Sequence, residues 1–284
     1  MANTLSTYTL RDKYFKSTLQ TQLRNALVAE KICKVDRSDL KRIQNPYITQ
    51  QTAAIQAVAG TYSVSAMTTT DDALTVTDEV VFGTHVYDFE TLTSEFNLTA
   101  DFLDDLSYSV LAGVDSFVLN NLCEDGTGAY TTPAGGFTTA ANIPVIMSNL
   151  LSKVAGYQGN QGGQFLVIEN TDIVGFAQAQ ASSGFSYADS ALNNGFMTNY
   201  MGVDIYVVRA GTFVSATIGS TTVSNSGHRV FGVKGVSMYA SPRGVRYEEK
   251  GVSGKTGKEI VAVALVGFKL WTPNASLVVD ITLA

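Results

Sequence analysis

Two stretches of the chain carry hydrophobic residues at helical spacing. The first lies in an N-terminal arm, where the spacing predicts a basic, amphipathic helix with these apolar positions: Phe15, Leu19, Leu23, Leu27 and Ile32. The second predicts a long helix over 102–122, with Thr99 as its N-cap. Asp101, Asp104 and Asp105 then lie near the helix N-terminus, where the helix dipole favours anions.

Between these helices, apolar and polar residues alternate as they do in strands. Residues 62–67 and 73–77 alternate with a period of two, and the polar residues 68–72 between them are expected to form the turn. This pair predicts a long, acidic β-hairpin with little core of its own, which needs another surface to lie against. A further strand is expected at 80–89.

The second half of the chain mixes helices with buried strands and ends in a strand-rich section. Residues 214–227 are expected to form an exposed loop or a weak hairpin. The helices are expected at 144–154 and from Asn170 or Thr171 to 181, and the strands at 164–168, 203–208, 229–238, 244–249, 259–270 and 277–281.

Charge is scarce and unevenly distributed. Only 15% of the 284 residues are charged while 45% are hydrophobic, which excludes general disorder. Residues 1–50 carry nine Lys/Arg and four Asp/Glu, whereas residues 51–150 carry thirteen Asp/Glu and no Lys or Arg. A surface short of charge and divided by sign favours contacts with other segments of the chain or with neighbouring copies.

The motifs that could indicate an enzyme lack residues that their chemistry requires. Residues 251–256 are similar to a phosphate-binding loop, but Glu249 stands where the first glycine is needed and strand-type sequence follows. His85 and His228 lack ligand-spaced companions, so we expect ordinary strand or loop residues there and no metal site. The acidic turn before the long helix is better explained by the helix dipole than by catalysis. We expect no enzyme and no cofactor.

The same sequence predicts a protein made in the cytoplasm. Its first residues have neither a basic start nor an apolar block, so no signal peptide is expected. No apolar run approaches the length of a membrane span. Two cysteines, Cys33 and Cys123, form no disulfide framework and suit a reducing compartment.

The order of these parts resembles the major capsid protein of tailed bacteriophages, with the Hong Kong 97-type fold, over essentially the whole chain. Residues 89–95, 195–205 and 267–275 are also similar to segments of that family. The resemblance implies an α+β fold with an N-arm, a long β-hairpin called the E-loop, a spine helix in a peripheral domain, and an α/β axial domain. The expected parts are a basic arm (1–47), the extended hairpin (48–90), the spine helix of the peripheral domain (91–139), the axial domain (140–228) and return strands (229–284).

The resemblance also implies a function. It predicts a structural capsid subunit that assembles into an icosahedral head enclosing phage DNA, located in the virion after assembly in the host cytoplasm. The implied partners are copies of itself in pentamers and hexamers, and scaffold, portal or decoration proteins, with only non-specific contact to double-stranded DNA and none to a membrane. Two alternatives stay open: the shell protein of an encapsulin-type nanocompartment, and another virion protein such as a tail protein.

The candidate contact residues are the charges of the hairpin and of the arm. The hairpin acids are expected to make salt-sensitive contacts between subunits: Asp71, Asp72, Asp78 and Glu79. The basic residues are expected to face scaffold or DNA inside the shell, or else a neighbour's acidic hairpin: Arg11, Lys13, Lys16, Arg24, Lys31 and Lys34.

One departure from the family concerns covalent cross-linking. In the cross-linked form, a hairpin lysine forms an isopeptide bond with an asparagine of a neighbour's peripheral domain, assisted by a buried carboxylate. Residues 48–152 contain no lysine, although Asn274 would supply the asparagine and Glu248, Glu249 or Glu259 the carboxylate. Without an amine nucleophile we expect a shell held by non-covalent contacts alone.

Overall fold

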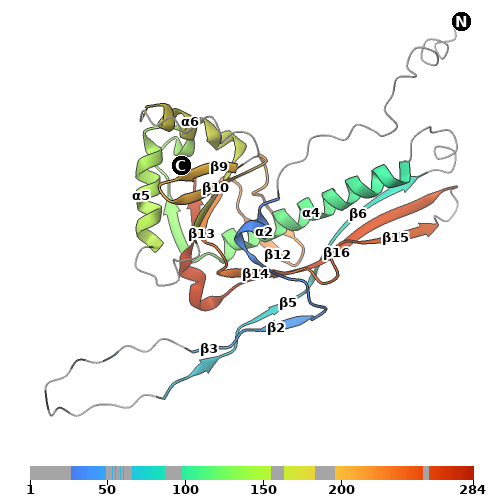
Figure 1. The fold of residues 1–284 in the computed structure, drawn as a ribbon, viewed down its shortest axis with the longest axis horizontal. Coiled ribbons are helices and arrows are strands. Elements are labelled where there is room, and N and C mark those ends of the chain that lie inside the picture. Colours follow the sequence, from blue (N-terminus) through green and yellow to red (C-terminus); the bar gives the residue numbers. More distant parts are fainter. Residues whose placement is uncertain are drawn as a thin grey trace, which may run out of the picture.

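A long helix joins the two sheets of the molecule, and a hairpin leads away from both (Figure 1). None of the described helices is long and apolar enough to cross a membrane. The computed structural model describes residues 27–48, 66–86, 98–154, 163–182, 196–251 and 256–284, with the isolated positions 53, 55, 58 and 60.

The first sheet has five strands and lies along the long helix α4 (Leu98–Asp125). Its central strand β16 (Lys258–Leu270) pairs antiparallel with β6 (Asp78–Val86), β14 (Ser237–Ala240) and β15 (Arg246–Gly251). At the far edge, β1 (Lys34–Asp36) pairs parallel with β14. The basic arm therefore enters the body as an edge strand of this sheet.

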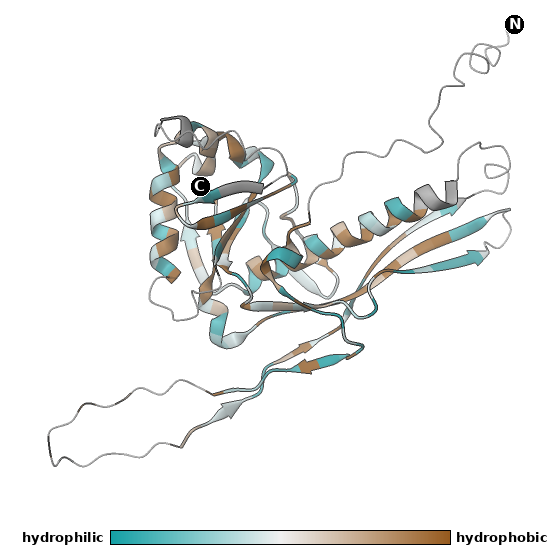
Figure 2. Ribbon diagram, viewed as in Figure 1, coloured by the Kyte–Doolittle hydropathy of each residue, from teal (hydrophilic) through white to brown (hydrophobic). Residues whose placement is uncertain are grey.

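Small residues let α4 approach this sheet closely. Ala262 and Ala264 of β16 share one buried core with Val110 of α4, and the hydrophobic positions of β16 are brown in Figure 2. At Gly113 a β-carbon would lie 2.7 Å from Cγ1 of Val80 on β6. A larger residue at Gly113 would push the helix away from the sheet, since packed interiors have no room to yield.

The second sheet has six strands, and helices α5 (Asn142–Val154) and α6 (Ile173–Ser182) lie on its outer side in Figure 1. Residues 165–168 of its central strand are each at most 1% exposed, so both faces of the sheet are covered. Its strands, in spatial order, are β7 (Gly128–Thr131), β17 (Val278–Thr282), β13 (His228–Val233), β8 (Gln164–Glu169), β10 (Val203–Val208) and β9 (Phe196–Tyr200).

Short elements complete the described chain. Two antiparallel ladders form the projecting hairpin: β2 (Arg42–Gln44) pairs with β5 (Ala73–Thr75), and β3 (Tyr47–Ile48) pairs with β4 (Thr69–Thr70). The remaining elements are α2 (Ala29–Ile32), η1 (Gly136–Thr138), η3 (Asn170–Asp172), β11 (Ser215–Ile218), β12 (Thr221–Ser224) and η4 (Thr272–Leu277).

The pairing predicted for the hairpin is wrong. Residues 68–72 do not form its turn, because β4 lies there, and the partner of β5 is β2. The threonine run suits a strand, since threonine is β-branched and an exposed ladder needs no apolar face. The predicted range 48–90 also includes β6, which belongs to the five-stranded sheet of the body. The strand predicted at 62–67 lies largely outside the described residues.

Two predicted helix starts are also wrong. Helix α4 begins at Leu98, so Thr99 lies inside the helix and is not its N-cap. The helix predicted to begin at Asn170 or Thr171 is preceded by the short helix η3, whose N-cap is Glu169. Glu169 and Asp172 form a capping box there, and α6 follows η3 directly. Most of the helix predicted in the arm lies outside the described residues, which include only α2 from that region.

Candidate assembly site

The root of the hairpin is fixed to the body by a small apolar cluster. Leu74 of β5 is fully buried with Ala240 of β14 and with Trp271, which follows β16. At Gly267 a β-carbon would lie 2.5 Å from the carbonyl oxygen of Thr75, so the hairpin backbone crosses β16 in direct contact. The base of the hairpin therefore has a defined position on the body.

Two adjacent aspartates at this root have opposite environments. The side chain of Asp72 is 8% exposed; Oδ2 accepts the N–H of Thr272 at 2.8 Å, and Oδ1 lies 3.4 Å from Nζ of Lys269. Burial alone would raise the pKa of Asp72, but this N–H and the ammonium hold it below its usual value. Asp71 is 48% exposed and lies 3.7 Å from Arg42 of the same hairpin.

We expect Asp72→Ala to destabilise the subunit by about 1–3 kcal/mol, because it leaves the N–H of Thr272 without its acceptor. The exposed neighbour gives the control, and Asp71→Ala should cost less than about 1 kcal/mol. Since the pKa of Asp72 is lower in the folded state, its contribution is complete above the unfolded-state pKa and is lost as the pH falls through the folded-state pKa. Urea unfolding across acidic pH measures both effects, and equal losses in the two variants would contradict the assignment.

Asp78, at the start of β6, is also used within its own subunit. The residue is 8% exposed, and its carboxylate accepts the N–H and the hydroxyl of Ser220 at 2.6 Å and 3.0 Å. Ser220 lies in the turn between β11 and β12, so Asp78 ties the base of the hairpin to that turn. The next residue, Glu79, is exposed and alternates with Val80, which packs against the core.

The four predicted hairpin acids therefore form two groups. Asp72 and Asp78 hold the root of the hairpin, whereas Asp71 and Glu79 offer exposed carboxylates. Contact between these acids and neighbouring subunits stays a prediction. Asp71 and Glu79 are the better candidates for it, because their carboxylates are exposed.

The basic arm is described only from Leu27 onward. Lys31 and Lys34 are exposed, and Nζ of Lys31 lies 5.8 Å from the ring centroid of Tyr206. Four of the predicted basic residues lie outside the described part of the chain: Arg11, Lys13, Lys16 and Arg24. The role of the arm in facing scaffold, DNA or a neighbour's hairpin stays a prediction.

The long helix fixes the point where the arm joins the body. Asp115 of α4 accepts the backbone N–H groups of Val28 and Ala29 at 2.9 Å and 2.6 Å, at the start of α2. Burial raises the pKa of Asp115, and these two N–H groups offset part of that increase. The carboxylate of Asp115 thus serves as a cap supplied from another helix.

Large apolar side chains are exposed along the hairpin. Ile55 and Val58 are 101% exposed, and Ile48 and Met67 more than half exposed. Single exposed apolar residues are ordinary, but several on one projection, whose described residues from Ile48 to Asp71 are all exposed, indicate a surface that another protein covers.

A groove of about 340 Å³ lies beside the hairpin root. Apolar side chains and charges of both signs line it, which suits a protein surface better than a small polar ligand. The lining residues are Asp39, Leu40, Lys41, Val76, Thr77, Asp78, Glu79, Pro242, Arg243, Arg246 and Leu265.

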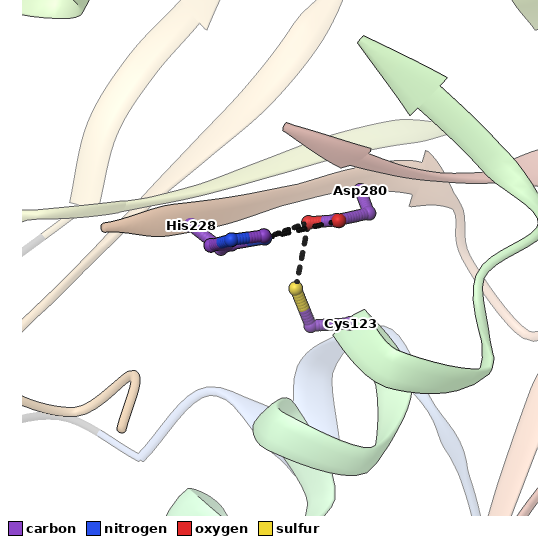
Figure 3. Close-up of side chains that lie close together, drawn as sticks. All are labelled: Cys123, His228 and Asp280. Atoms are coloured by element: carbon purple, nitrogen blue, oxygen red, sulfur yellow. Dashed lines mark hydrogen bonds and ion pairs between the residues drawn. The ribbon is translucent and has the colours of Figure 1, made fainter. Parts of the chain in front are cut away.

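A polar cluster lies where the last turn of α4 meets strands β13 and β17 of the six-stranded sheet (Figure 3). Both carboxylate oxygens of Asp280 lie within 3.0 Å of Nδ1 of His228, and Oδ1 also accepts the thiol proton of Cys123 at 3.0 Å. Burial raises the pKa of the Cys123 thiol, and the Asp280 carboxylate raises it further. Because Asp280 separates the thiol from the imidazole, this order does not activate Cys123 as a nucleophile.

A second polar cluster is fully internal. The Arg229 side chain, 4% exposed, donates to Asp172 at 2.5 Å and to Glu169 at 3.1 Å. Glu169 also accepts the N–H of Gly211 at 3.0 Å, so the charges are hydrogen-bonded as well as paired. The network joins β8, η3 and β13 at one point.

Sequence reasoning found neither polar cluster. Cys123 and Asp280 are 157 residues apart, and Asp280 is 52 residues from His228, so no local spacing marks them. The fold brings His228 beside two other ligand-type side chains, which its sequence neighbours do not indicate.

Solved structures that resemble this chain come from phages and from a GTA particle. A capsid structure of the cyanophage P-SCSP1u has a TM-score of 0.72 at 12% identity, covering 97% of this chain and 93% of that chain. A structure from Mycobacterium phage Che8 has a TM-score of 0.74 at 15% identity, with 96% and 97% covered. The capsid of a native GTA particle has a TM-score of 0.72 at 14% identity, with both chains covered completely.

No family model and no curated protein sequence matches the chain. The structural likeness nevertheless extends over nearly the whole of both chains in each comparison. At such low identity it establishes the fold. The chain therefore has the α+β, Hong Kong 97-type capsid fold that the order of its elements predicts.

Proposed function

We propose that this protein is the major capsid subunit of a tailed phage and assembles into the icosahedral head that encloses the phage DNA. The observation that carries the proposal is the full-length likeness to capsid subunits, at TM-scores of 0.72–0.74 in three comparisons. Its partners are first of all copies of itself, arranged as pentamers and hexamers.

The surface of the single subunit supports this role. The hairpin exposes Ile55 and Val58 to water, while its root is fixed by Asp72 and Asp78. A heterologous contact, in which one subunit's projection covers a different surface of the next, generates a closed shell when repeated around closed symmetry. Exposed ion pairs contribute only about 0–1 kcal/mol each, so apolar burial repeated over many copies must supply most of the stability.

The charge of the N-terminal arm supports a position on the inner face of the shell. The arm carries nine Lys/Arg within residues 1–50, which suits an inner position facing a scaffold protein or DNA phosphates. Such contact with DNA is electrostatic and independent of sequence.

Negative-stain electron microscopy of the purified protein, with and without a co-expressed scaffold, tests the proposal. We expect closed particles of uniform diameter that protect DNA from nuclease once packaged. A monodisperse monomer of 30.3 kDa at every salt concentration, even with scaffold supplied, would overturn it. Particles that enclose proteins and never nucleic acid would favour a nanocompartment shell instead.

We expect mature particles to run as a single band at the subunit mass of 30.3 kDa on a denaturing gel. The physical reason is that residues 48–152, which include the hairpin, contain no lysine and therefore no amine to form an isopeptide bond. Particles boiled in detergent and reductant provide the measurement. A ladder of pentamer- and hexamer-sized species would show that another amine reaches a neighbouring subunit.

A further inference from the structure

Three potential metal ligands converge at the end of the long helix. His228 and Asp280 lie on the adjacent strands β13 and β17, where Asp280 pairs with Val230, two residues after His228. Side chains two residues apart share one face of a strand, so the imidazole and the carboxylate lie on the same face of this ladder. Cys123, in the last turn of α4, points toward them from the helix (Figure 3).

The ligand atoms are close enough to share one ion. Sγ of Cys123, a ring nitrogen of His228 and a carboxylate oxygen of Asp280 all lie within 4.8 Å of one another. On a tetrahedral zinc ion with bonds of about 2.0–2.3 Å, such atoms lie about 3.4–3.6 Å apart. The two hydrogen bonds of Asp280, at 2.9 Å and 3.0 Å, would lengthen by about half an ångström, which a small rotation of its side chain supplies.

The chemistry of these ligands selects the metal. A thiolate, an imidazole and a carboxylate together suit zinc, whereas magnesium and calcium prefer oxygen ligands alone. The thiolate and the carboxylate carry two negative charges, which balance a divalent cation. The side chains of His228 and Asp280 are 22% and 25% exposed, so an ion can reach them from solvent, which also supplies water as the fourth ligand.

We propose that Cys123, His228 and Asp280 form a structural zinc site that joins the end of the long helix α4 to strands β13 and β17. On binding, the Cys123 thiol transfers its proton to solvent and its sulfur bonds to the ion, so one proton leaves for each ion bound. The hydrogen bonds that now link Cys123 and His228 to Asp280 are replaced by bonds to the common ion. The proton that Nδ1 of His228 donates to Asp280 moves through solvent to Nε2, which leaves the lone pair of Nδ1 for the ion. The site is independent of shell formation, because all three ligands belong to one subunit.

Cobalt(II) is the probe for the experiment, because it replaces zinc in such sites and gives an absorption band when a thiolate binds it. We expect full-length protein, dialysed against a chelator and titrated with Co²⁺, to develop a cobalt–thiolate band that one equivalent of Zn²⁺ removes. Cys123→Ser and Asp280→Asn should each lose this band. Zn²⁺ should also raise the unfolding temperature of the unaltered protein and leave that of Cys123→Ser unchanged.

The chain offers a matched control for each ligand type, since it has two cysteines and two histidines. Cys33 is also buried but its sulfur accepts a hydrogen bond from the hydroxyl of Ser237, so Cys33→Ser should retain the band. His228→Asn should lose the band, and His85→Asn should retain it. Absence of the band in the unaltered protein, or a band that survives Cys123→Ser, would overturn the site and leave the cluster a hydrogen-bonded junction. Neither result depends on whether the protein forms particles.

Discussion

Replacing Arg229 with alanine is expected to lower the free energy of unfolding by about 3–5 kcal/mol, because it leaves two buried carboxylates without their cation. The side chains of Glu169 and Asp172 are only 12% and 3% exposed, so water cannot take the place of the guanidinium. The network joins β8, η3 and β13, so the loss should affect the six-stranded sheet as a unit. Urea unfolding of the unassembled subunit provides the measurement.

An exposed arginine with similar geometry provides the control. Arg37 lies 2.7 Å from Glu30, but their side chains are 69% and 53% exposed. Arg37→Ala should therefore cost no more than about 1 kcal/mol. Similar losses in the two variants would mean that burial of the Arg229 network does not determine its contribution.

Shortening the hairpin is expected to abolish particle formation while the subunit still folds. Tyr47 and Ile48 pair with Thr70 and Thr69, so residues 49–68 can be replaced by Asn-Gly, the preferred two-residue turn for this register. The core contains no described residue of the removed segment, so the unfolding transition should stay within about 1 kcal/mol of the original. Electron microscopy and light scattering measure the loss of particles.

A second variant separates the length of the hairpin from its apolar character. Ile55→Ser combined with Val58→Ser keeps the full length but removes two side chains that are completely exposed in the single subunit. If these side chains are buried between subunits, the double variant should assemble weakly even at high salt, where ionic contacts matter least. Normal particles from the shortened chain would rule out the hairpin as an assembly element.

The sequence predicted those elements whose pattern is local. The apolar stripe along α4 indicates a helix with one buried face, and the nearly continuous apolar run of β16 indicates a strand that is largely buried on both faces. Both elements lie where they were expected. The order of elements was then sufficient to predict the fold class, which the structural comparisons confirm.

The parts that could not be predicted depend on partners distant in sequence. Asp71 and Asp72 are adjacent residues of the same type, yet only Asp72 is buried. Its carboxylate accepts the N–H of Thr272, which lies 200 residues farther along the chain. The prediction of the strand that pairs with β5 failed for the same reason, because alternation identifies a strand but not its neighbour, which is β2. Nothing near Arg229 in the sequence indicates the two carboxylates that it meets.

The contact of Gly267 with Thr75 makes the hairpin a lever with its fulcrum on β16. Displacement along a lever grows with distance from the fulcrum, so a slight rotation at the root moves the outer end of the described ladder, Ile48 and Thr69, farther than the residues that cause it. In a shell built from this subunit, the angle between neighbours would follow that rotation. The curvature of the shell, and hence its diameter, would then depend on the few groups around Gly267 that set this angle within the subunit.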